Sequence, residues 1–412
     1  MTFPLRCRPD GRFTILQVSD AQDLHFVRRA MFRMLDAAYD RVRPDLVVFT
    51  GDNILGNHLG DARFGRWQSA RRPAAIFRRM RRAIRHLLRP LERRRIPFAF
   101  LFGNHDDMNV IAKAEQASVY ASSPCFAGPV PDDPRLTPGS GLIRIQAADG
   151  TRTAFALWLL DSAGSDDSGR PVYTHVPPES VAWFSARAKE LRTENGGVPV
   201  PSLVFQHIPI PETLLLLEEA PAGSPGAVPH GGRFWRLNPA CAAGVLGTYP
   251  HPCSINTGEL DAFERQGGVL AVASGHDHRN CFVGRLRGID LVQTPCASFR
   301  CYGGLMRGVR VFRLDAAAPE RYETETLTYG DLMGGGLLAR LRFFWDADET
   351  EQKRRGCCAL WACWPVWRLR FWCWRHCSDG RLPFFKSKTA GQIAVPLFFL
   401  MIFGVCRYTC RS

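Results

Sequence analysis

Residues 98–106 read FAFLFGNHD, a run of five apolar side chains followed by a glycine and three polar residues. The run has the length and composition of a β-strand that is buried on both faces, and such strands lie in the middle of a layered α/β fold. Open α/β sheets bind their ligands beyond the carboxyl ends of the strands. The stretch therefore predicts an α/β protein with a functional site at the end of this strand, at Asn104, His105 and Asp106.

The same arrangement, an apolar strand that ends at a residue able to bind a metal ion, occurs at four other places in the chain. These are residues 14–20 (TILQVSD), 46–53 (LVVFTGDN), 203–207 (LVFQH) and 269–278 (VLAVASGHDH). Residues 27–39, between the first two strands, have the pattern of a crossover helix. Five such endings are improbable by chance, so we expect the five strand ends to meet at one site.

The residues at these strand ends are of the types that phosphate-ester hydrolysis needs. Two divalent cations about 3.5–4 Å apart generate a nucleophile from water at neutral pH and neutralise charge on the phosphate. Such a pair requires a carboxylate between the ions, together with oxygen and imidazole ligands. The candidate ligands are Asp20, Asp52, Asn104, His207, His276 and His278. Asp52 is the candidate bridge between the ions, and His105 is the candidate proton donor to the leaving group.

Taken in order, these motifs resemble the calcineurin-like metallophosphoesterase superfamily, whose pattern is D-x-H, GD, GNH[DE], a single histidine and GHxH. The resemblance covers about residues 13–314. The phrases HIPIPE at 207–212 and RGVRVF at 307–312 are similar to the branch related to purple acid phosphatases. The resemblance implies a four-layer α/β/β/α sandwich with two central mixed sheets.

The resemblance also implies roles for the candidate site residues. The six strand-end ligands would hold two divalent metal ions, which would be Mn, Fe or Zn, with Mn favoured. His105 corresponds to the histidine that protonates the leaving group or steadies the transition state. Asp106 would orient His105 through a hydrogen bond, the arrangement that fixes a histidine tautomer.

The chain departs from the family pattern at the first motif, where D-x-H is replaced by DAQ at residues 20–22. The carbonyl oxygen of Gln22 suits harder ions such as Mn²⁺ better than Zn²⁺. Alternatively, His25 of the DLH sequence at 23–25 completes the first metal site, and the choice between Gln22 and His25 stays open. No tyrosine follows Asp52 closely, which argues against a purple ferric centre.

The expected function is metal-dependent hydrolysis of a phosphate ester, with a phosphomonoesterase favoured over a phosphodiesterase. The alternative is a catalytically weak scaffold that keeps the fold but not full metal loading, and Gln22 is the feature that favours it. Residues 124–140 and 218–258 are rich in Gly and Pro, and we expect both to be loops. The loop after Asn53 and the loop at 124–140 would select the substrate.

The net charge of +14 is concentrated in residues 71–95 and in the last part of the chain. Within 71–95, apolar residues recur at helical spacing with arginines between them, which predicts a surface helix with a basic solvent face. Aromatic side chains do not alternate with these arginines as a nucleic-acid stacking platform requires. We therefore expect no nucleic-acid partner, and the expected partner remains the phosphate-ester substrate.

The character of the sequence changes near residue 333, so we expect a phosphoesterase domain over 1–332 and a C-terminal tail over 333–412. The tail is rich in Trp, Cys and Arg at 357–377, and 393–406 is an apolar run of 14 residues. A bilayer-spanning helix needs about 20 apolar residues, so the tail is either an interfacial membrane contact or an irregular, poorly ordered segment. Residues 1–13 lack the apolar core of a secretory signal, and we expect a cytoplasmic protein, with membrane association through the tail left open.

Overall fold

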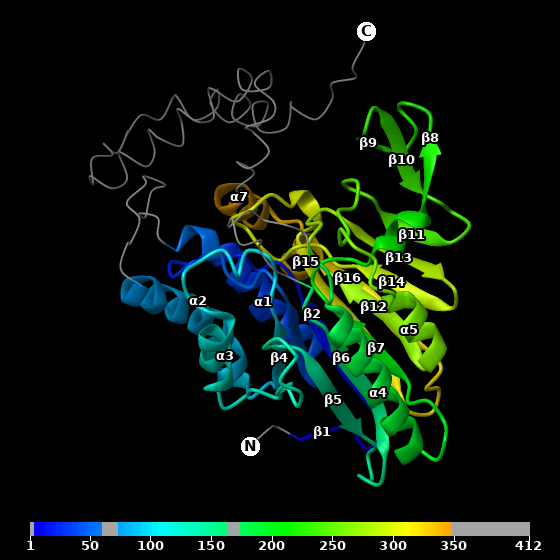
Figure 1. Ribbon diagram of the computed structural model, residues 1–412. Coiled ribbons are helices and arrows are strands. Elements are labelled where there is room, and N and C mark those ends of the chain that lie inside the picture. Colours follow the sequence, from blue (N-terminus) through cyan, green and yellow to red (C-terminus); the bar gives the residue numbers. More distant parts are fainter. Residues whose placement is uncertain (1–3, 60–72, 163–173, 348–412) are drawn as a thin grey trace, which may run out of the picture. The chain divides into compact units, whose positions relative to one another are not determined.

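The computed structural model describes residues 4–59, 73–162 and 174–347. Two β-sheets form its centre (Figure 1). The five-stranded sheet has the order β16 (Tyr322–Thr328), β15 (Gly308–Asp315), β2 (Arg12–Val18), β3 (Leu46–Thr50) and β4 (Phe98–Leu101). The eight-stranded sheet has the order β1 (Leu5–Arg6), β5 (Gly141–Gln146), β6 (Thr153–Leu159), β7 (Ser202–Phe205), β12 (Val269–Ser274), β14 (Ile289–Gln293), β13 (Cys281–Leu286) and β11 (Ala242–Val245). Both sheets combine parallel and antiparallel neighbours.

Helices cover the outer face of each sheet. The five-stranded sheet packs against α1 (Arg29–Val42), α2 (Pro73–Arg94) and α3 (Lys113–Ala121), and the eight-stranded sheet packs against α4 (Pro178–Glu194) and α5 (Glu259–Gln266) (Figure 1). Two further helices, α6 (Tyr329–Met333) and α7 (Leu337–Asp346), follow β16. Short 3₁₀ turns lie at η1 (Gly56–His58), η2 (Pro211–Leu216) and η3 (Gly304–Met306).

The alternation of side chains along the strands explains why the fold has four layers. Successive side chains of a strand point to opposite faces of its sheet. In β2, Ile15 packs between the two sheets, whereas Leu16 packs against the helices. In β3, Val48 packs between the two sheets and Val47 packs against the helices. Because each central strand is apolar on both faces, it can be buried on both, and the predicted α/β/β/α sandwich is confirmed.

The elements that carry the five motifs agree with the sequence predictions. The predicted crossover helix corresponds to α1, and the arginine-rich segment corresponds to α2, which buries Met80, Ile84, Leu87 and Leu91 and exposes arginines between them. Residues 124–140 form a loop, as expected.

The second predicted loop, residues 218–258, is not a simple loop. It contains β11 and most of a small three-stranded antiparallel sheet, made of β8 (Leu217–Ala220), β10 (Arg233–Leu237) and β9 (Val228–His230). Its glycines mark tight turns between short strands, with φ of 80° at Gly223 and 78° at Gly232. The high Gly and Pro content therefore indicated hairpin turns here, not the absence of strands.

Helix α7 lies within the stretch that the sequence assigned to the tail. Its Phe343 ring packs edge-on against both Phe299 and Tyr329, with ring centroids 5.3 and 5.2 Å apart. The compact unit that contains the sheets includes α7, whose last residue is Asp346. The Trp, Cys and Arg-rich part of the tail and its apolar run lie outside the described residues. Within the described ranges, every helix is too short or too polar to cross a membrane.

Candidate metal centre

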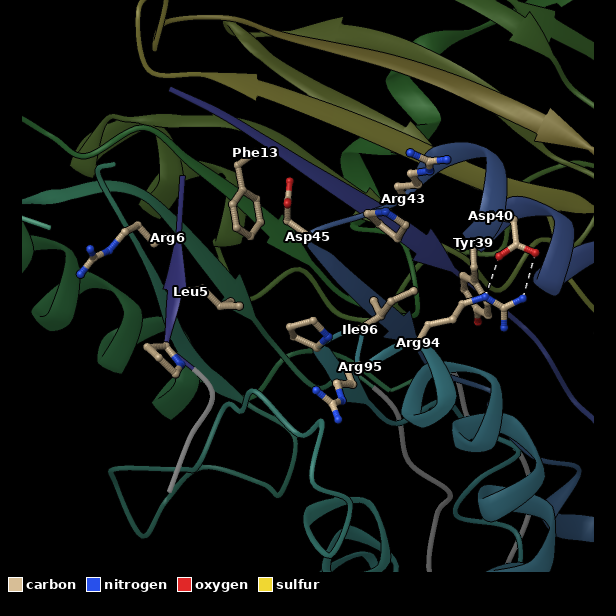
Figure 2. A pocket seen from close by; sticks show the side chains of 13 residues that line it. Leu5, Arg6, Phe13, Tyr39, Asp40, Arg43, Asp45, Arg94, Arg95 and Ile96 are labelled. Atoms are coloured by element: carbon tan, nitrogen blue, oxygen red, sulfur yellow. Dashed lines mark hydrogen bonds and ion pairs between the residues drawn. The ribbon is translucent and has the colours of Figure 1, made fainter. Parts of the chain in front are cut away.

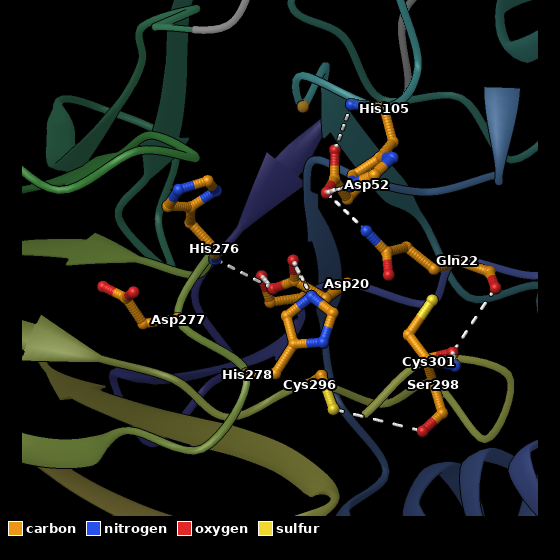
Figure 3. Close-up of polar contacts among 12 residues, drawn as sticks. Asp20, Gln22, Asp52, His105, His276, Asp277, His278, Cys296, Ser298 and Cys301 are labelled. Atoms are coloured by element: carbon orange, nitrogen blue, oxygen red, sulfur yellow. Dashed lines mark hydrogen bonds and ion pairs between the residues drawn. The ribbon is translucent and has the colours of Figure 1, made fainter. Parts of the chain in front are cut away.

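The carboxyl ends of strands from both sheets meet at one place. The segment after β2 bonds to the segment after β3, where Asp20 N–H donates to Gly51 O at 3.1 Å. The segment after β12 bonds to the end of β7, where Gly275 N–H donates to His207 O at 3.0 Å. The two sheets are joined across the site because His276 N–H donates to Asp20 Oδ2 at 3.0 Å. Figure 3 shows His276 and His278 from one sheet facing Asp20 and Asp52 from the other.

The innermost part of the site is a cluster of two carboxylates and one imidazole. Asp20, Asp52 and His207 each offer a ligand atom, and these atoms lie within 4.8 Å of one another. All three side chains are at most 1% exposed. Asp52 Oδ2 lies 3.4 Å from His207 Nε2. Two buried carboxylates this close to each other require compensating positive charge.

Three more predicted ligands surround this cluster. Asn104 Oδ1 lies 3.1 Å from Nε2 of His207, and His278 Nε2 lies 3.3 Å from Oδ1 of Asp20. The ring of His276 packs edge-on to the ring of His207, with centroids 5.2 Å apart. The structure thus brings together all six residues that the strand-end pattern selected.

Two of the histidines are oriented by backbone carbonyls behind them. His207 Nδ1 lies 2.9 Å from Thr50 O, and His278 Nδ1 lies 2.8 Å from Tyr302 O. In each ring the contact with the carbonyl holds Nδ1 on the far side and turns Nε2 toward the cluster. This is the arrangement that orients histidine ligands in metal sites.

The local electrostatics keep the two carboxylates ionised. Burial raises the pKa of Asp52, but His207 and His105 outweigh burial and hold that pKa well below its usual range. Burial also raises the pKa of Asp20, but the nearby His278 outweighs burial, and the pKa of Asp20 is lowered. Burial lowers the pKa of His207, but Asp52 outweighs it and raises that pKa to about 9.

The backbone at the candidate ligands is strained. Asp20, Gln22, Asp52 and His276 have φ of 51°, 33°, 50° and 70°, in the left-handed region that L-residues other than glycine rarely adopt. Each such residue costs about 1–3 kcal/mol and persists only where its surroundings enforce it. The strain concentrates at the strand ends that turn side chains into the cluster, which is typical of functional sites.

Two motif glycines are required because the candidate ligands pack against them. A Cβ at Gly103 would lie 2.1 Å from Asp52 Oδ1, and a Cβ at Gly275 would lie 2.6 Å from Asp20 Oδ2. Any side chain at either position would displace a carboxylate of the cluster. The glycines of GNHD and GHDH therefore leave room for Asp52 and Asp20.

The residues present fit a divalent cation. Gln22 Oε1 is buried and has no hydrogen-bond partner among the described residues, and Asp20 Oδ1 faces only His278 Nε2, 3.3 Å away. Unpaired buried oxygens are costly unless another group satisfies them. Two carboxylates, amide oxygens and neutral imidazole nitrogens form the donor set of a first-row divalent metal.

At the first motif, Gln22 reaches the cluster and His25 does not. Gln22 is 1% exposed, and its Nε2 donates to Asp52 Oδ2 at 2.5 Å. His25 stacks edge-on against Phe26. Burial lowers the pKa of His25 to about 4, with Arg79 and Arg82 of α2 contributing. His25 therefore lies near the basic helix α2 and outside the Asp20–Asp52–His207 cluster.

His105 stands at the open side of the cluster. Its Nε2 lies 3.9 Å from Asp52 Oδ2, its Nδ1 is buried, and its side chain is 22% exposed. Its backbone N–H donates to Asp52 Oδ1 at 2.8 Å, which fixes the position of the ring relative to the carboxylate. His105 is therefore placed where a proton donor could reach a bound substrate.

The predicted hydrogen bond from Asp106 to the His105 ring is absent, and this part of the prediction is corrected. Asp106 is fully buried, and its carboxylate accepts the backbone N–H groups of Gly103 at 2.8 Å, Ile54 at 3.0 Å and Asn53 at 3.1 Å. Burial and the nearby Asp52 raise the pKa of Asp106 to about 8. Asp106 joins the loop after β3 to the loop after β4, so it positions the motifs and does not touch the reacting group.

Sequence reasoning missed a sixth polar strand end, at Asp161. β6 pairs in parallel with β7, with Leu159 opposite Phe205, so Asp161 follows its strand as His207 follows β7. Lys113 Nζ bonds to Asp161 Oδ2 at 2.5 Å and to Asp107 Oδ2 at 3.0 Å. The signal was present, because residues 154–161 (AFALWLLD) have the same apolar-then-Asp pattern as the other strands.

The family model described as calcineurin-like phosphoesterase matches residues 13–280. The chain belongs to the calcineurin-like phosphoesterase family, as the order of its motifs predicted.

Two plant proteins are among the relatives. The chain is 28% identical to "Probable inactive purple acid phosphatase 28" of Arabidopsis thaliana, over 73% of this chain and 72% of the relative. It is 27% identical to "Probable inactive purple acid phosphatase 29" of the same organism, over 76% of this chain and 79% of the relative. Among solved structures, a dimetal phosphatase from Danio rerio is 15% identical and has a TM-score of 0.44, over 77% of this chain and 99% of that chain.

Proposed function

We propose that the protein hydrolyses a phosphate monoester at the cluster of Asp20, Asp52 and His207. The observation that carries the proposal is the convergence of two ionised, buried carboxylates and an oriented imidazole beside a partly exposed histidine, His105. Acidic side chains do not gather in a dry interior without a cation or another compensating group.

In the proposed centre, two divalent metal ions would be held by the candidate ligands. These are Asp20, Gln22, Asp52, Asn104, His207, His276 and His278. Ions bound there would supply a nucleophile from water at neutral pH and would neutralise charge on the phosphate. We favour Mn²⁺, because two amide oxygens in the donor set suit a harder ion than Zn²⁺.

His105 is the proposed proton donor to the leaving oxygen. Nε2 is the ring nitrogen that lies toward Asp52, whereas Nδ1 is buried away from solvent. A proton donated from Nε2 would go to the oxygen that leaves, which prevents an unstable alkoxide from forming. The bond from the His105 N–H to Asp52 keeps this donor in register with the carboxylate.

A monoester is favoured over a diester because the plant relatives carry the name of purple acid phosphatases. The same relatives are named probable inactive proteins, and this supports a second candidate function, that of a scaffold with the fold and incomplete metal loading. Gln22 favours the scaffold, because its amide N–H bonds to an oxygen of Asp52 that would otherwise be free to bind metal.

The test uses the full chain, purified and loaded in turn with Mn²⁺, Fe²⁺ and Zn²⁺. The enzyme proposal expects two ions per chain by elemental analysis and faster hydrolysis of p-nitrophenyl phosphate than of bis-p-nitrophenyl phosphate. Asp52→Asn should lose bound metal and activity together. A wild-type chain that stays inert with all three metals would favour the scaffold, and unchanged metal content in Asp52→Asn would remove Asp52 as a bridging ligand.

A further inference from the structure

Helix α7 is apolar on two opposite faces, and only one of them packs against the protein. On this inner face, Ala339 and Phe343 join the hydrophobic cluster between the five-stranded sheet and its helices. Asp346 Oδ2 accepts the N–H of Ala30, at the start of α1, at 2.6 Å. The helix is therefore held beside α1 in a fixed orientation, at the outside of the described fold (Figure 1).

The outward face of α7 carries a stripe of large apolar side chains. At 3.6 residues per turn, positions 337, 338, 341, 344 and 345 fall within about 120° of the helix circumference. We call them the apolar stripe, and each is at least 41% exposed: Leu337, Leu338, Leu341, Phe344 and Trp345. In the described ranges, the other exposed large hydrophobic side chains are scattered along the chain from Val110 to Leu305. Single exposed apolar residues are ordinary, whereas a contiguous patch marks an interaction surface.

Arginines border the apolar stripe on both sides. Arg340 and Arg342 fall at the two boundaries between the outward and the inner face of α7. Arg340 is exposed and Arg342 is half-buried, and Arg29 and Arg33 are exposed on the neighbouring α1. The acidic residue of α7, Asp346, is turned inward to α1. A face of Leu, Phe and Trp with arginines along its edges is typical of helices that lie in a lipid interface.

The segment that follows α7 does not complement this surface in charge. Positions 348–412 contain eleven lysines and arginines but only four aspartates and glutamates. Arginines beside the apolar stripe would repel a segment of the same charge, whereas an anionic surface attracts both. The Trp and Arg-rich composition of 357–377 suits the same kind of interface. An anionic bilayer therefore matches the stripe better than the rest of this chain does.

We propose that the outward face of α7 binds an anionic lipid surface, with the apolar stripe at the boundary of headgroups and acyl chains and with Arg340 and Arg342 at the lipid headgroups. A helix of this kind lies in the plane of the membrane and inserts its apolar face by about 5–10 Å. The interaction goes beyond the proposed phosphoesterase activity and does not depend on it.

The test is co-sedimentation of the full chain with vesicles of phosphatidylcholine and phosphatidylserine in equal parts, and with vesicles of phosphatidylcholine alone. The variant Leu338→Gln with Leu341→Gln changes two exposed side chains, so its melting temperature should stay close to that of wild type. Its Kd for the mixed vesicles should rise by at least about tenfold, the effect of removing two apolar side chains from the lipid boundary. Wild type should bind phosphatidylcholine alone at least about tenfold more weakly than the mixed vesicles.

Two variants that remove the same charge separate local contact from net charge. Arg340→Gln with Arg342→Gln should weaken binding to the mixed vesicles and leave binding to phosphatidylcholine unchanged. Arg43→Gln with Arg95→Gln is the control, at a hollow by the amino ends of β3 and β4 (Figure 2). Arg43 follows the far end of α1, roughly 20 Å from Ala30 at about 1.5 Å per residue. This control should change neither Kd by more than about twofold, because salt screens charges at that distance.

Three results would overturn the proposal. The first is an equal Kd for the mixed vesicles in wild type and in the Leu338→Gln, Leu341→Gln variant. The second is an equal loss of binding in the Arg43→Gln, Arg95→Gln control, which would reduce the effect to net charge. The third is a lowered melting temperature in the leucine variant with unchanged vesicle binding, which would show that another protein segment covers the apolar stripe.

Discussion

The side-chain amide of Gln22 donates a hydrogen bond of 2.5 Å to Oδ2 of Asp52. The residue that stands where the family pattern has a histidine thus contacts the carboxylate expected to bridge the metals. The amide nitrogen of Gln22 is a hydrogen-bond donor and cannot bind a cation. Its Oε1 could bind one, and this oxygen is buried without a hydrogen-bond partner among the described residues. The affinity of the first metal position therefore depends on which end of this amide faces the cluster.

Gln22→His should raise the affinity for divalent metal, because an imidazole nitrogen would replace an amide that donates to Asp52. We expect the apparent Kd for Mn²⁺ to fall by at least about tenfold, since even residues that only support metal ligands change affinity by 10–100-fold. Competition with a chelator, followed by elemental analysis, measures the change.

The matched control is Gln22→Leu, which removes both the donor and the ligand atom from a buried position of similar size. It should bind less metal than wild type. If Gln22→His and Gln22→Leu bind Mn²⁺ equally well, position 22 is not part of the metal site.

His105→Ala should cut hydrolysis of p-nitrophenyl phosphate by roughly 10²–10⁴-fold, the range for a positioned proton donor. Metal content should stay at the wild-type level, because the bond to Asp52 comes from the backbone of residue 105 and survives the substitution. The loss should be larger for alkyl phosphates than for p-nitrophenyl phosphate, because poor leaving groups depend more on the proton. His86→Ala on α2 is the control. A His105→Ala enzyme with lowered metal content would instead give His105 a structural role.

Asp106→Ala should destabilise the fold by about 2–4 kcal/mol, because three buried N–H groups would lose their acceptor. Urea unfolding monitored by tryptophan fluorescence measures the change. Asp106→Asn keeps one side-chain oxygen as an acceptor and should recover part of the loss. If Asp106→Ala unfolds at the same urea concentration as wild type, the three hydrogen bonds contribute little to stability.

Much of the site was predictable from sequence because one local pattern carries it. An apolar strand followed by a metal-capable residue appears at the ends of β2, β3, β4, β7 and β12, and the sheet topology alone brings such ends together. The same pattern ends β6 at Asp161, a residue that the prediction did not include.

Other features of the site depend on tertiary contacts that no local pattern carries. The partners of Asp106 come from residues 53, 54 and 103, and the first two lie 53 and 52 positions earlier in the chain. The orientation of His278 depends on the carbonyl of Tyr302, 24 residues later. The positive φ at Asp20 and Asp52 follows from the clustering itself. Sequence predicted which residues meet, and packing determined what each one does there.

A last prediction concerns Glu259, at the start of α5 and outside the metal site. Its side chain is 2% exposed, and among the described residues neither carboxylate oxygen has a hydrogen-bond partner. Burial, with the charge of Glu212 adding to it, raises the pKa of Glu259 to about 8 from an ordinary value of 4.5. Between those pH values the folded chain holds a proton that the unfolded chain releases, so stability falls as the pH rises from about 5 to about 8.

Glu259→Gln cannot titrate, and it should be more stable than wild type by about 2–4 kcal/mol at pH 8 and nearly equal to it at pH 5. Urea unfolding at both pH values measures the difference, with the exposed Glu264→Gln on the same helix as the control. A Glu259→Gln variant with the wild-type dependence on pH would show that the buried carboxyl group titrates normally.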